Sequence, residues 1–317
     1  MVSGRRMETA PSASVSVPVL CVGNFIAGGA GKTPTAIAIC RAAAKHGLKP
    51  GFLSRGFGGS LAGPALVDLA HHHAAEVGDE PLLLAEEAPT VISADRPAGA
   101  ARLVAEGCDF IILDDGFQNP HLAKDYNLVV VDAGRGIGNG MTIPSGPLRA
   151  PLTRQMALAD SVVVIGDAPG GDRVIRETAR RGKPSFLASL KPMQKAKWRK
   201  MRCLAFAGIG DPEKFFASLA ECGADLVLTR AFPDHHVYSD EEIEELLEEA
   251  REQDLALVTT TKDMARLRGA GSMKEKLAEE SQVFGVELEF EDQRTLSLIL
   301  DATLARAEER ALKKLAA

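Results

Sequence analysis

Val17–Pro34 reads VPVLCVGNFIAGGAGKTP and is the most informative stretch of this 317-residue chain. It joins an apolar run, Val17–Val22, to a glycine-rich turn and then to a helical pattern that opens with Pro34. A glycine-rich turn between a strand and a helix lets backbone N–H groups converge on phosphate oxygens, which also gain from the positive end of the helix. The sequence therefore predicts a phosphate-binding loop, or P-loop.

Within this loop, Lys32 is placed to reach the β- and γ-phosphates of ATP, and the Thr33 hydroxyl is placed to bind Mg²⁺. Ile26 stands where the common P-loop pattern has a glycine. The alternative is a glycine-rich turn that binds no nucleotide, but the order of strand, loop and helix favours the P-loop. The residues expected to contact ATP are Ile26, Ala27, Gly28, Gly29, Ala30, Gly31, Lys32 and Thr33.

The rest of the chain alternates short apolar runs with helical patterns, which is typical of βα units on a parallel sheet. Several runs are almost wholly apolar, as strands buried on both faces must be. The expected strands are 17–22, 110–113, 128–131, 161–165, 203–207, 226–229 and 255–259, and the expected helices are 34–46, 80–87, 97–106, 213–221, 240–253 and 295–315.

We therefore expect an α/β fold, with a P-loop NTPase-like parallel sheet flanked by helices and a second, smaller α/β domain. The basic stretch Lys191–Arg202 (KPMQKAKWRKMR) separates the two halves. This division predicts a P-loop core domain at 1–190, a linker at 191–202 and the smaller domain at 203–317. The linker is otherwise expected to be a solvated loop without a ligand.

Composition excludes several classes of protein. The formal net charge is −6, from 37 basic and 43 acidic residues, and aromatic residues make up 5%, so the chain is not expected to bind nucleic acid. The five cysteines form no C-x-x-C pair and are expected to be free thiols in a reducing compartment. No signal peptide and no run of eighteen apolar residues is present, which predicts a cytoplasmic protein without a transmembrane helix.

A second acidic element, DFIILDDGFQ, covers residues 109–118. An apolar strand that ends in carboxylates, here Asp114 and Asp115, holds Mg²⁺ or its waters beside the phosphates in P-loop proteins. Taken alone, a strand that ends in Asp-Asp-Gly is more often just a turn. The P-loop beside it favours the metal role.

Two acid–base candidates lie in different halves of the chain. Asp79, in GDEP at residues 78–81, either caps an apolar helix or takes a proton from an attacking hydroxyl. His235, in FPDHH at residues 232–236, could partner Asp79 across a cleft between the domains, although a lone histidine is more often structural. The residues alone leave both choices open.

Three further motifs have weaker meanings. Arg55, in SRGFGG, suits a contact with phosphate or sugar, or belongs to a simple turn. Thr259–Asp263 (TTTKD) either lines a pocket or caps the next helix. His71–His73 is expected to be an exposed loop, because no other ligand accompanies it at metal-binding spacing.

The ordered set of motifs resembles the tetraacyldisaccharide 4′-kinase family, the lipid A 4′-kinases of Gram-negative bacteria, from about Val17 to about Arg268. The motifs that carry the resemblance are VPVLCVGNFIAGGAGKTP, SRGFGG, GDEPLLLA, ILDDGFQN, VVVDAGRGIGNGMTIPSGPLRAPL, FAGIGDPEKFF, FPDHHVYSDEE and TTTKD. The displaced first glycine of the P-loop is also a feature of that family.

The resemblance implies a P-loop kinase of two α/β/α domains with its active site in the cleft between them. It would move the γ-phosphate of ATP to the 4′-hydroxyl of tetraacyldisaccharide 1-phosphate, the lipid A disaccharide precursor, to give lipid IVA. The residues that match the family's functional positions are Lys32 and Thr33 for nucleotide and Mg²⁺, Asp79 as catalytic base with His235 as its partner, Asp114 and Asp115 beside the metal, and Arg55 for substrate.

The chain departs from the family pattern in two places. Asn119 replaces the usual histidine after DDGFQ, so this expected substrate-binding position can donate a hydrogen bond but cannot titrate. The family usually begins with a hydrophobic membrane segment, whereas mostly polar residues precede Val17. We expect a monomer on the cytoplasmic face of the inner membrane, docked through Arg5, Arg6 and exposed apolar residues.

Two other functions compete with the kinase. A P-loop switch ATPase would control a protein partner and would need neither Asp79 nor His235. A nucleotide-binding scaffold without enzymatic activity would not need to keep both Lys32 and the pair Asp114–Asp115. The GDEP and FPDHH motifs, in separate halves of the chain, favour the kinase.

Overall fold

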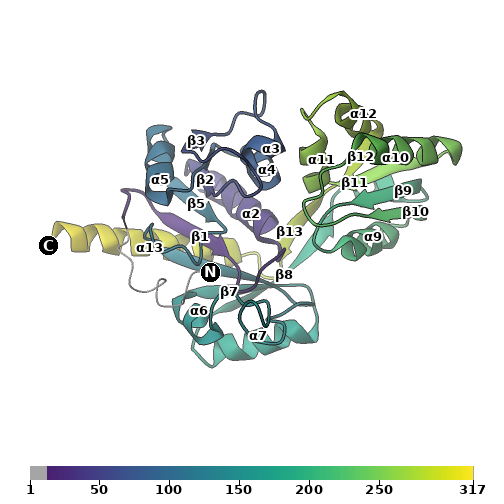
Figure 1. The fold of residues 1–317 in the computed structure, drawn as a ribbon. Helices are drawn as coiled ribbons and strands as arrows, with labels where there is room; N and C mark the ends of the chain where they lie inside the picture. The colour runs from purple at the N-terminus through teal and green to yellow at the C-terminus, as the bar shows by residue number, and fades with distance from the viewer. Residues whose placement is uncertain (1–12, 317) are drawn as a thin grey trace.

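The computed structural model describes residues 13–316, which form a large and a small α/β domain (Figure 1). The large domain is built on a nine-stranded sheet in the order β13-β8-β7-β6-β1-β5-β2-β4-β3. All neighbouring strands are parallel except the edge pairs β13–β8 and β3–β4. The strands are β1 (Val19–Gly23), β2 (Pro50–Ser54), β3 (Ala65–Leu66), β4 (Thr90–Ile92), β5 (Phe110–Asp114), β6 (Tyr126–Asp132), β7 (Ser161–Ile165), β8 (Ser185–Pro192) and β13 (Val286–Phe290).

Helices cover both faces of this sheet. Successive residues of β1 point to opposite faces, so Val19 and Cys21 pack in the cluster that includes α5, α6 and α7, whereas Leu20 and Val22 pack in the cluster that includes α2 and α13. The helices of this domain are α2 (Lys32–Lys45), α3 (Ala74–Val77), α4 (Asp79–Ala85), α5 (Arg96–Ala105), α6 (Leu152–Leu158), α7 (Pro169–Ala179) and α13 (Thr295–Leu315). This arrangement confirms the expected P-loop NTPase-like sheet with flanking helices.

The small domain has a four-stranded parallel sheet in the order β10-β9-β11-β12. One face packs against α10, α11 and α12, and the other against α8 and α9. Its elements are α8 (Lys195–Trp198), β9 (Arg202–Ala207), α9 (Pro212–Glu221), β10 (Asp225–Ala231), α10 (Asp240–Glu252), β11 (Ala256–Thr260), α11 (Thr261–Leu267), α12 (Ser272–Glu280) and β12 (Ser281–Phe284).

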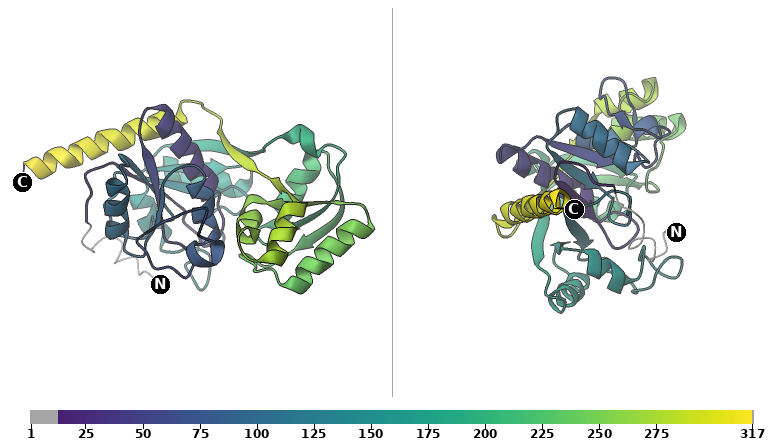
Figure 2. Two further views of the ribbon diagram at one scale, coloured as in Figure 1. Left: turned by 90° about the horizontal axis from the view of Figure 1, so that it is seen from above. Right: turned by 90° about the vertical axis from the view of Figure 1, so that its left-hand side faces the viewer.

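The chain passes between the domains twice, and this corrects the expected boundaries. We expected residues 203–317 to form the smaller domain, but β13 pairs antiparallel with β8, and α13 lies against the large sheet, where Ile299 and Leu300 are fully or almost fully buried. The sequence missed this return because an antiparallel edge strand leaves no local signal of the sheet to which it belongs. Figure 2 shows α13 extending from the large domain away from the small one.

The expected linker at 191–202 is not a simple loop. Its first residues belong to β8, and α8 follows, with the Trp198 side chain packed against Phe284 in the small-domain core. The two connecting strands, β8 and β13, therefore form a paired bridge rather than one flexible tether (Figure 1).

Two other expectations concern thiols and membrane spans. All five cysteines are free and buried, as expected. Among the helices of residues 13–316, none has the length and apolarity to cross a membrane. The expected docking residues Arg5 and Arg6 lie outside the described residues.

Candidate active site

The P-loop joins β1 to α2 at the carboxyl edge of the large sheet. Gly31 precedes α2 with a φ of 85°, a left-handed conformation that favours glycine, and Lys32 opens the helix with 7% of its surface exposed. Ile26 is 5% exposed, and its backbone forms an isolated β-bridge with Leu148, which lies in the segment between β6 and α6. A glycine at position 26 would leave this apolar packing unfilled, which gives a physical reason for the displaced glycine.

Asp114, the last residue of β5, and Asp115, which follows it, lie beside the P-loop, because β5 pairs directly with β1 and sets Asp114 opposite Val22. Asp115 Oδ2 lies 3.8 Å from Lys32 Nζ. Burial alone would raise the pKa of Asp115, but the charges of Lys32 and Arg149 outweigh it and lower that pKa. Asp115 is therefore an ionised partner of the P-loop lysine.

Asp114 has a different environment. It is 1% exposed, and neither of its carboxylate oxygens has a hydrogen-bond partner. Burial, with a further contribution from the charge of Glu80, raises the pKa of Asp114 to about 7. A buried carboxylate without a partner is costly unless a cation or proton satisfies it.

These residues fit a magnesium ion. Asp114 supplies unused oxygen ligands, and Thr33, 4% exposed, follows Lys32 at the start of α2. Mg²⁺ in such sites takes one or two protein oxygens and completes its shell with phosphate and water. Accordingly, residues 13–316 contain no group of three or more His, Cys, Asp or Glu side chains that would hold a metal unaided.

The sequence analysis missed a polar cluster that braces this side of the site. Arg149 donates two hydrogen bonds to the Asp115 carboxylate, at 2.7 and 3.0 Å. Gln118 donates to the carbonyl of Asn24 in the P-loop at 2.7 Å and to the buried Gln155 side chain at 2.9 Å. Arg149 lies in the quoted stretch PSGPLRAPL, but nothing in that stretch pairs it with Asp115.

Asp79 of the large domain and His235 of the small domain lie in contact where the two domains meet. Asp79 is the first residue of α4 and is 3% exposed, and its Oδ2 lies 3.3 Å from His235 Nδ1. The structure thus brings together two residues separated by more than 150 positions, as the sequence analysis expected if the two form a pair. Gly78 occupies the N-cap of α4, but the Asp79 side chain also serves the helix start, because its Oδ1 accepts from the backbone N–H of Glu80 at 2.8 Å.

Charges around this pair define its protonation. Burial would raise the pKa of Asp79, but His235 and the cations Lys262 and Arg266 lower it overall. The Asp79 carboxylate in turn raises the pKa of His235. Asp79 Oδ2 lies 3.3 Å from His235 Nδ1 and 3.4 Å from Arg266 Nε, so these two side chains stabilise the ionised form of the carboxylate.

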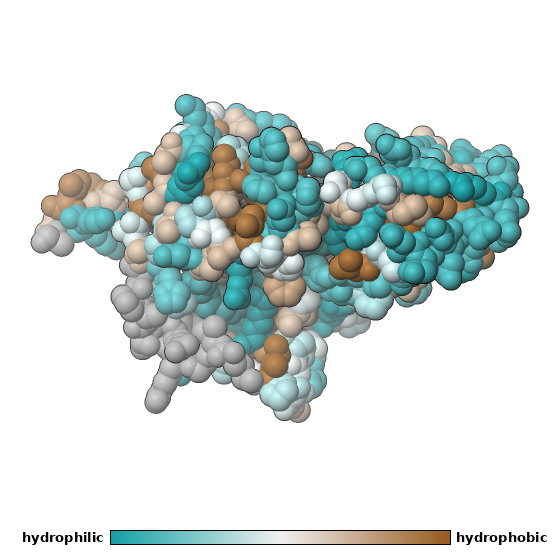
Figure 3. All heavy atoms as spheres, turned by 45° about the horizontal axis from the view of Figure 1, so that its top comes forward, coloured by the Kyte–Doolittle hydropathy of each residue, from teal (hydrophilic) through white to brown (hydrophobic). Residues whose placement is uncertain are grey.

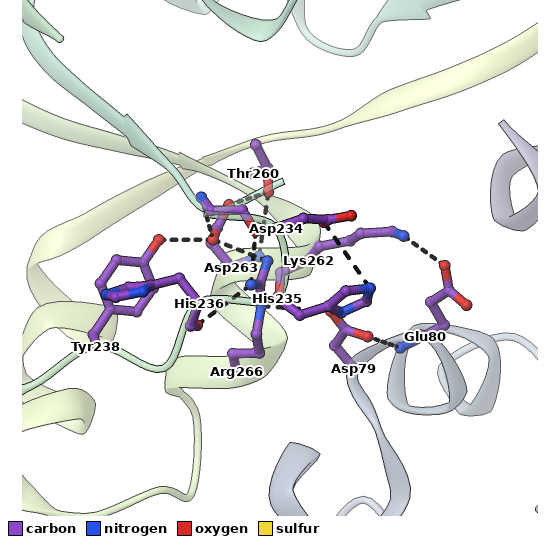
Figure 4. A network of polar contacts seen from close by, with 11 residues as sticks. Asp79, Glu80, Asp234, His235, His236, Tyr238, Thr260, Lys262, Asp263 and Arg266 are labelled. Carbon is purple, nitrogen blue, oxygen red and sulfur yellow. Dashed lines mark hydrogen bonds and ion pairs between the residues drawn. The ribbon is translucent and has the colours of Figure 1, made fainter. Parts of the chain in front are cut away.

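The small domain contributes a network of polar residues behind the pair (Figure 4). Lys262 Nζ reaches across to Glu80 Oε1 at 2.6 Å. Arg266 spans both domains, with Nε 3.4 Å from Asp79 and Nη2 3.0 Å from the fully buried Asp263. Asp263 also accepts from the Tyr238 hydroxyl at 2.7 Å, and Thr260 caps α11. The TTTKD motif therefore caps a helix and, through Lys262, also contacts the large domain.

The remaining candidates are less tightly placed. Arg55 follows β2, is exposed, and makes no ion pair or hydrogen bond with any residue in the described part of the chain. The Asn119 side chain accepts from the backbone N–H of His121 at 2.9 Å and forms no hydrogen bond with Asp79, Lys32 or Asp114. His71 is exposed, as expected, and lies 2.8 Å from Asp68.

Comparison with known proteins shows the family to which the chain belongs. The family model described as Tetraacyldisaccharide-1-P 4′-kinase matches residues 2–305. The tetraacyldisaccharide 4′-kinase of Agrobacterium fabrum is 51% identical over 312 residues, which cover 98% of this chain and 90% of that protein. The Rhizobium etli protein of the same name is 51% identical over 314 residues, or 99% of this chain and 91% of that one.

A solved structure shows the same fold. It is the crystal structure of the "apo" form of LpxK from Aquifex aeolicus in complex with ATP, with a TM-score of 0.70 and 24% identity over 93% of this chain and 91% of that one. From the family match and the curated relatives together, the chain belongs to the tetraacyldisaccharide-1-P 4′-kinase family.

Proposed function

We propose that the cleft between the two domains transfers the γ-phosphate of ATP to the 4′-hydroxyl of tetraacyldisaccharide 1-phosphate, the lipid A disaccharide precursor, giving lipid IVA. The chain is a kinase by family. The observation that carries the assignment of the site is the contact of 3.3 Å between Asp79 and His235 across the cleft, beside a P-loop.

The P-loop side of the cleft holds the nucleotide. Residues 26–33 cradle the phosphates with backbone N–H groups, and Lys32 neutralises charge on the β- and γ-phosphates. The ATP in the LpxK crystal structure supports this site. Asp114 and Thr33 hold Mg²⁺, which supplies charge neutralisation on the phosphates, and Asp115 holds Lys32 in place.

The α4 side of the cleft prepares the acceptor. Asp79 takes the proton from the 4′-hydroxyl, because a carboxylate positioned against a hydroxyl can act as a general base. His235 orients Asp79 and, when protonated, balances its charge. Since the two residues come from different domains, the pair forms only when the cleft is closed, which limits transfer of phosphate to water.

The acceptor explains two exposed apolar residues close to the Asp79–His235 pair. Phe57 is 64% exposed and packs edge-on against the His235 ring, with centroids 5.4 Å apart, and the nearby Val237 is 72% exposed. On the face drawn in Figure 3, apolar residues form small patches among hydrophilic ones. We infer that the protein docks on the cytoplasmic face of the inner membrane through a few such residues, with Arg55 and Asn119 on the lipid's polar part.

The reaction needs one copy of the chain. The contacts that build the site, Lys32 with Asp115 and Asp79 with His235, lie within a single chain, so we propose a monomeric enzyme.

The test is phosphate transfer in detergent micelles. The protein, Mg-ATP and tetraacyldisaccharide 1-phosphate are incubated, and the lipid is analysed by mass spectrometry, with Lys32→Ala as the control. The proposal expects the lipid to gain the mass of one phosphate with the wild-type protein only. ATP hydrolysis stimulated by a protein partner, without lipid phosphorylation, would instead support the switch ATPase.

A further inference from the structure

The loop that follows β6 carries a cation, Arg135, which lies beside the P-loop and has no role in the site described above. β6 pairs with β1 on the side opposite β5, so its carboxyl end also opens next to the P-loop. Arg135 lies in this loop, and a Cβ added at Gly28 would come within 3.0 Å of Arg135 Nη1. Gly28 is itself exposed and has a φ of +102°. The guanidinium of Arg135 therefore lies directly against the open side of the phosphate-binding turn.

The charge of Arg135 is not neutralised by any carboxylate within residues 13–316. The nearby Asp132 is paired instead with Lys214, and its Oδ1 accepts from the backbone N–H groups of Gly134 and Arg135. Arg135 makes one side-chain hydrogen bond, from Nη2 to the carbonyl of Gly210 at 2.7 Å. An arginine fork with free donors, held at a phosphate-binding loop, suits a phosphate group.

Gly210 connects Arg135 with the other half of the site. It lies in the loop 208–211 between β9 and α9 of the small domain, and a Cβ at Gly210 would lie 3.1 Å from the Asp234 carboxylate. In the same loop, the carbonyl of Gly208 accepts from the backbone N–H of His235 at 3.1 Å. A chain of contacts thus runs from Gly28 through Arg135 and this loop to His235.

We propose that Arg135 binds the terminal phosphates of ATP and, through Gly210, holds the small-domain loop that positions His235. The proposal rests on the nucleotide site described under the proposed function. A bound triphosphate fixes the guanidinium from one side, and the guanidinium fixes loop 208–211 from the other. Nucleotide binding on the large domain thereby orders the loop that supports the Asp79–His235 pair.

The test compares nucleotides that differ only in their phosphates. Binding of a non-hydrolysable ATP analogue, ADP and AMP is measured calorimetrically for the wild-type protein, Arg135→Ala, Arg135→Lys and Lys214→Ala. We expect Arg135→Ala to weaken binding of the ATP analogue by about tenfold or more, because a charge-assisted contact is lost, and to change AMP binding by less than about twofold. Lys214→Ala is the matched control, because Lys214 is a neighbouring cation already paired with Asp132, and it should keep the wild-type ratio.

Hydrogen–deuterium exchange measures the second half of the proposal. The ATP analogue should slow amide exchange in the 208–211 segment of the wild-type protein and of Lys214→Ala, but not of Arg135→Ala. Arg135→Lys keeps the charge without the fork and should restore part of the affinity but not the protection of the loop.

Clear outcomes would overturn the inference. If Arg135→Ala binds all three nucleotides as the wild type does, Arg135 touches no phosphate. If affinity falls equally for ATP analogue and AMP, with a lowered melting temperature, the residue is structural. Neither the binding measurement nor the exchange measurement involves the lipid. If the wild-type protein fails to phosphorylate the lipid, while Arg135→Ala still loses affinity for the ATP analogue and not for AMP, the result counts against the proposed function alone.

Discussion

Replacing Asp79 with Asn tests the role of the cross-cleft pair. The substitution keeps the size of the side chain and removes its charge and its capacity to accept a proton. In the structure, Asp79 forms no hydrogen bond or ion pair with residues 23–33 of the P-loop, and its charged neighbours are His235, Arg266 and Lys262. The variant should therefore lose the chemical step and keep the nucleotide.

The expected size of the effect follows from this environment. A positioned general base contributes about 10²–10⁴-fold to a rate, so kcat should fall by at least ~100-fold, or about 2.7 kcal/mol in the activation barrier. The free energy of unfolding should fall by only about 1–2 kcal/mol, less than for a fully orphaned buried charge. The reason is that Arg266 keeps its second carboxylate, Asp263, at 3.0 Å.

The assay measures kcat for lipid phosphorylation in micelles and, separately, the dissociation constant of an ATP analogue. Glu80→Gln is the matched control, because it also removes a cross-cleft ion pair, the one with Lys262, but leaves Asp79 intact. Its kcat should fall far less than that of Asp79→Asn. A kcat for Asp79→Asn within about threefold of wild type, or equal losses in both variants, would refute the assignment of Asp79 as base.

Three further predictions follow from charged groups. In NMR titrations the pKa of His235 should lie above its ordinary value of 6.5 and fall toward that value in Asp79→Asn. Because the folded protein has the higher pKa, the stabilisation by this pair is complete below about pH 6.5 and is lost as the pH rises through the raised pKa. A wild-type pKa at or below 6.5 would contradict the pairing. Asp114→Asn should abolish turnover and yet raise the free energy of unfolding, measured without Mg²⁺, by about 1–3 kcal/mol above pH 7. The gain should vanish toward pH 4, because the carboxyl group, with its pKa raised to about 7, destabilises the folded protein only when it is ionised. A loss of stability at pH 8 in denaturant titrations would contradict this prediction. Arg310→Ala should lower the free energy of unfolding by about 3 kcal/mol, because it leaves the buried Asp125 carboxylate without the charge that now lies 2.7 Å away, and a denaturant midpoint unchanged from wild type would refute that estimate.

The parts of the fold that the sequence predicts best are those with a strong local pattern. β1, β5, β6 and β7 are nearly continuous apolar runs, and the structure confirms all of them within two or three residues. β4 has only three residues, and β8, which lies between β13 and β7, has a single buried residue, Ala188, so neither has a local pattern that separates it from a loop. The membership of β13 depends on its pairing with β8, which is a non-local property.

The same distinction applies to the site. The P-loop is recognisable because its glycines and Lys32 lie in one stretch of sequence. The carboxylates Asp114 and Asp115 gain meaning from the same P-loop, since adjacent parallel strands open at one edge of the sheet. By contrast, the cited partners of Arg149, Arg266 and Arg135 lie 34 to 187 positions away, and no spacing in the sequence signals those contacts.

The central claim is that this cleft moves the γ-phosphate of ATP to the 4′-hydroxyl of the acylated disaccharide. The most direct measurement uses ATP labelled with ¹⁸O in its γ-phosphate and locates the label in the lipid product by tandem mass spectrometry. The account predicts a labelled phosphate on the sugar that carries the 4′-hydroxyl, formed by the wild-type protein and not by Lys32→Ala. A lipid that stays unlabelled while labelled inorganic phosphate accumulates at the same rate would contradict it.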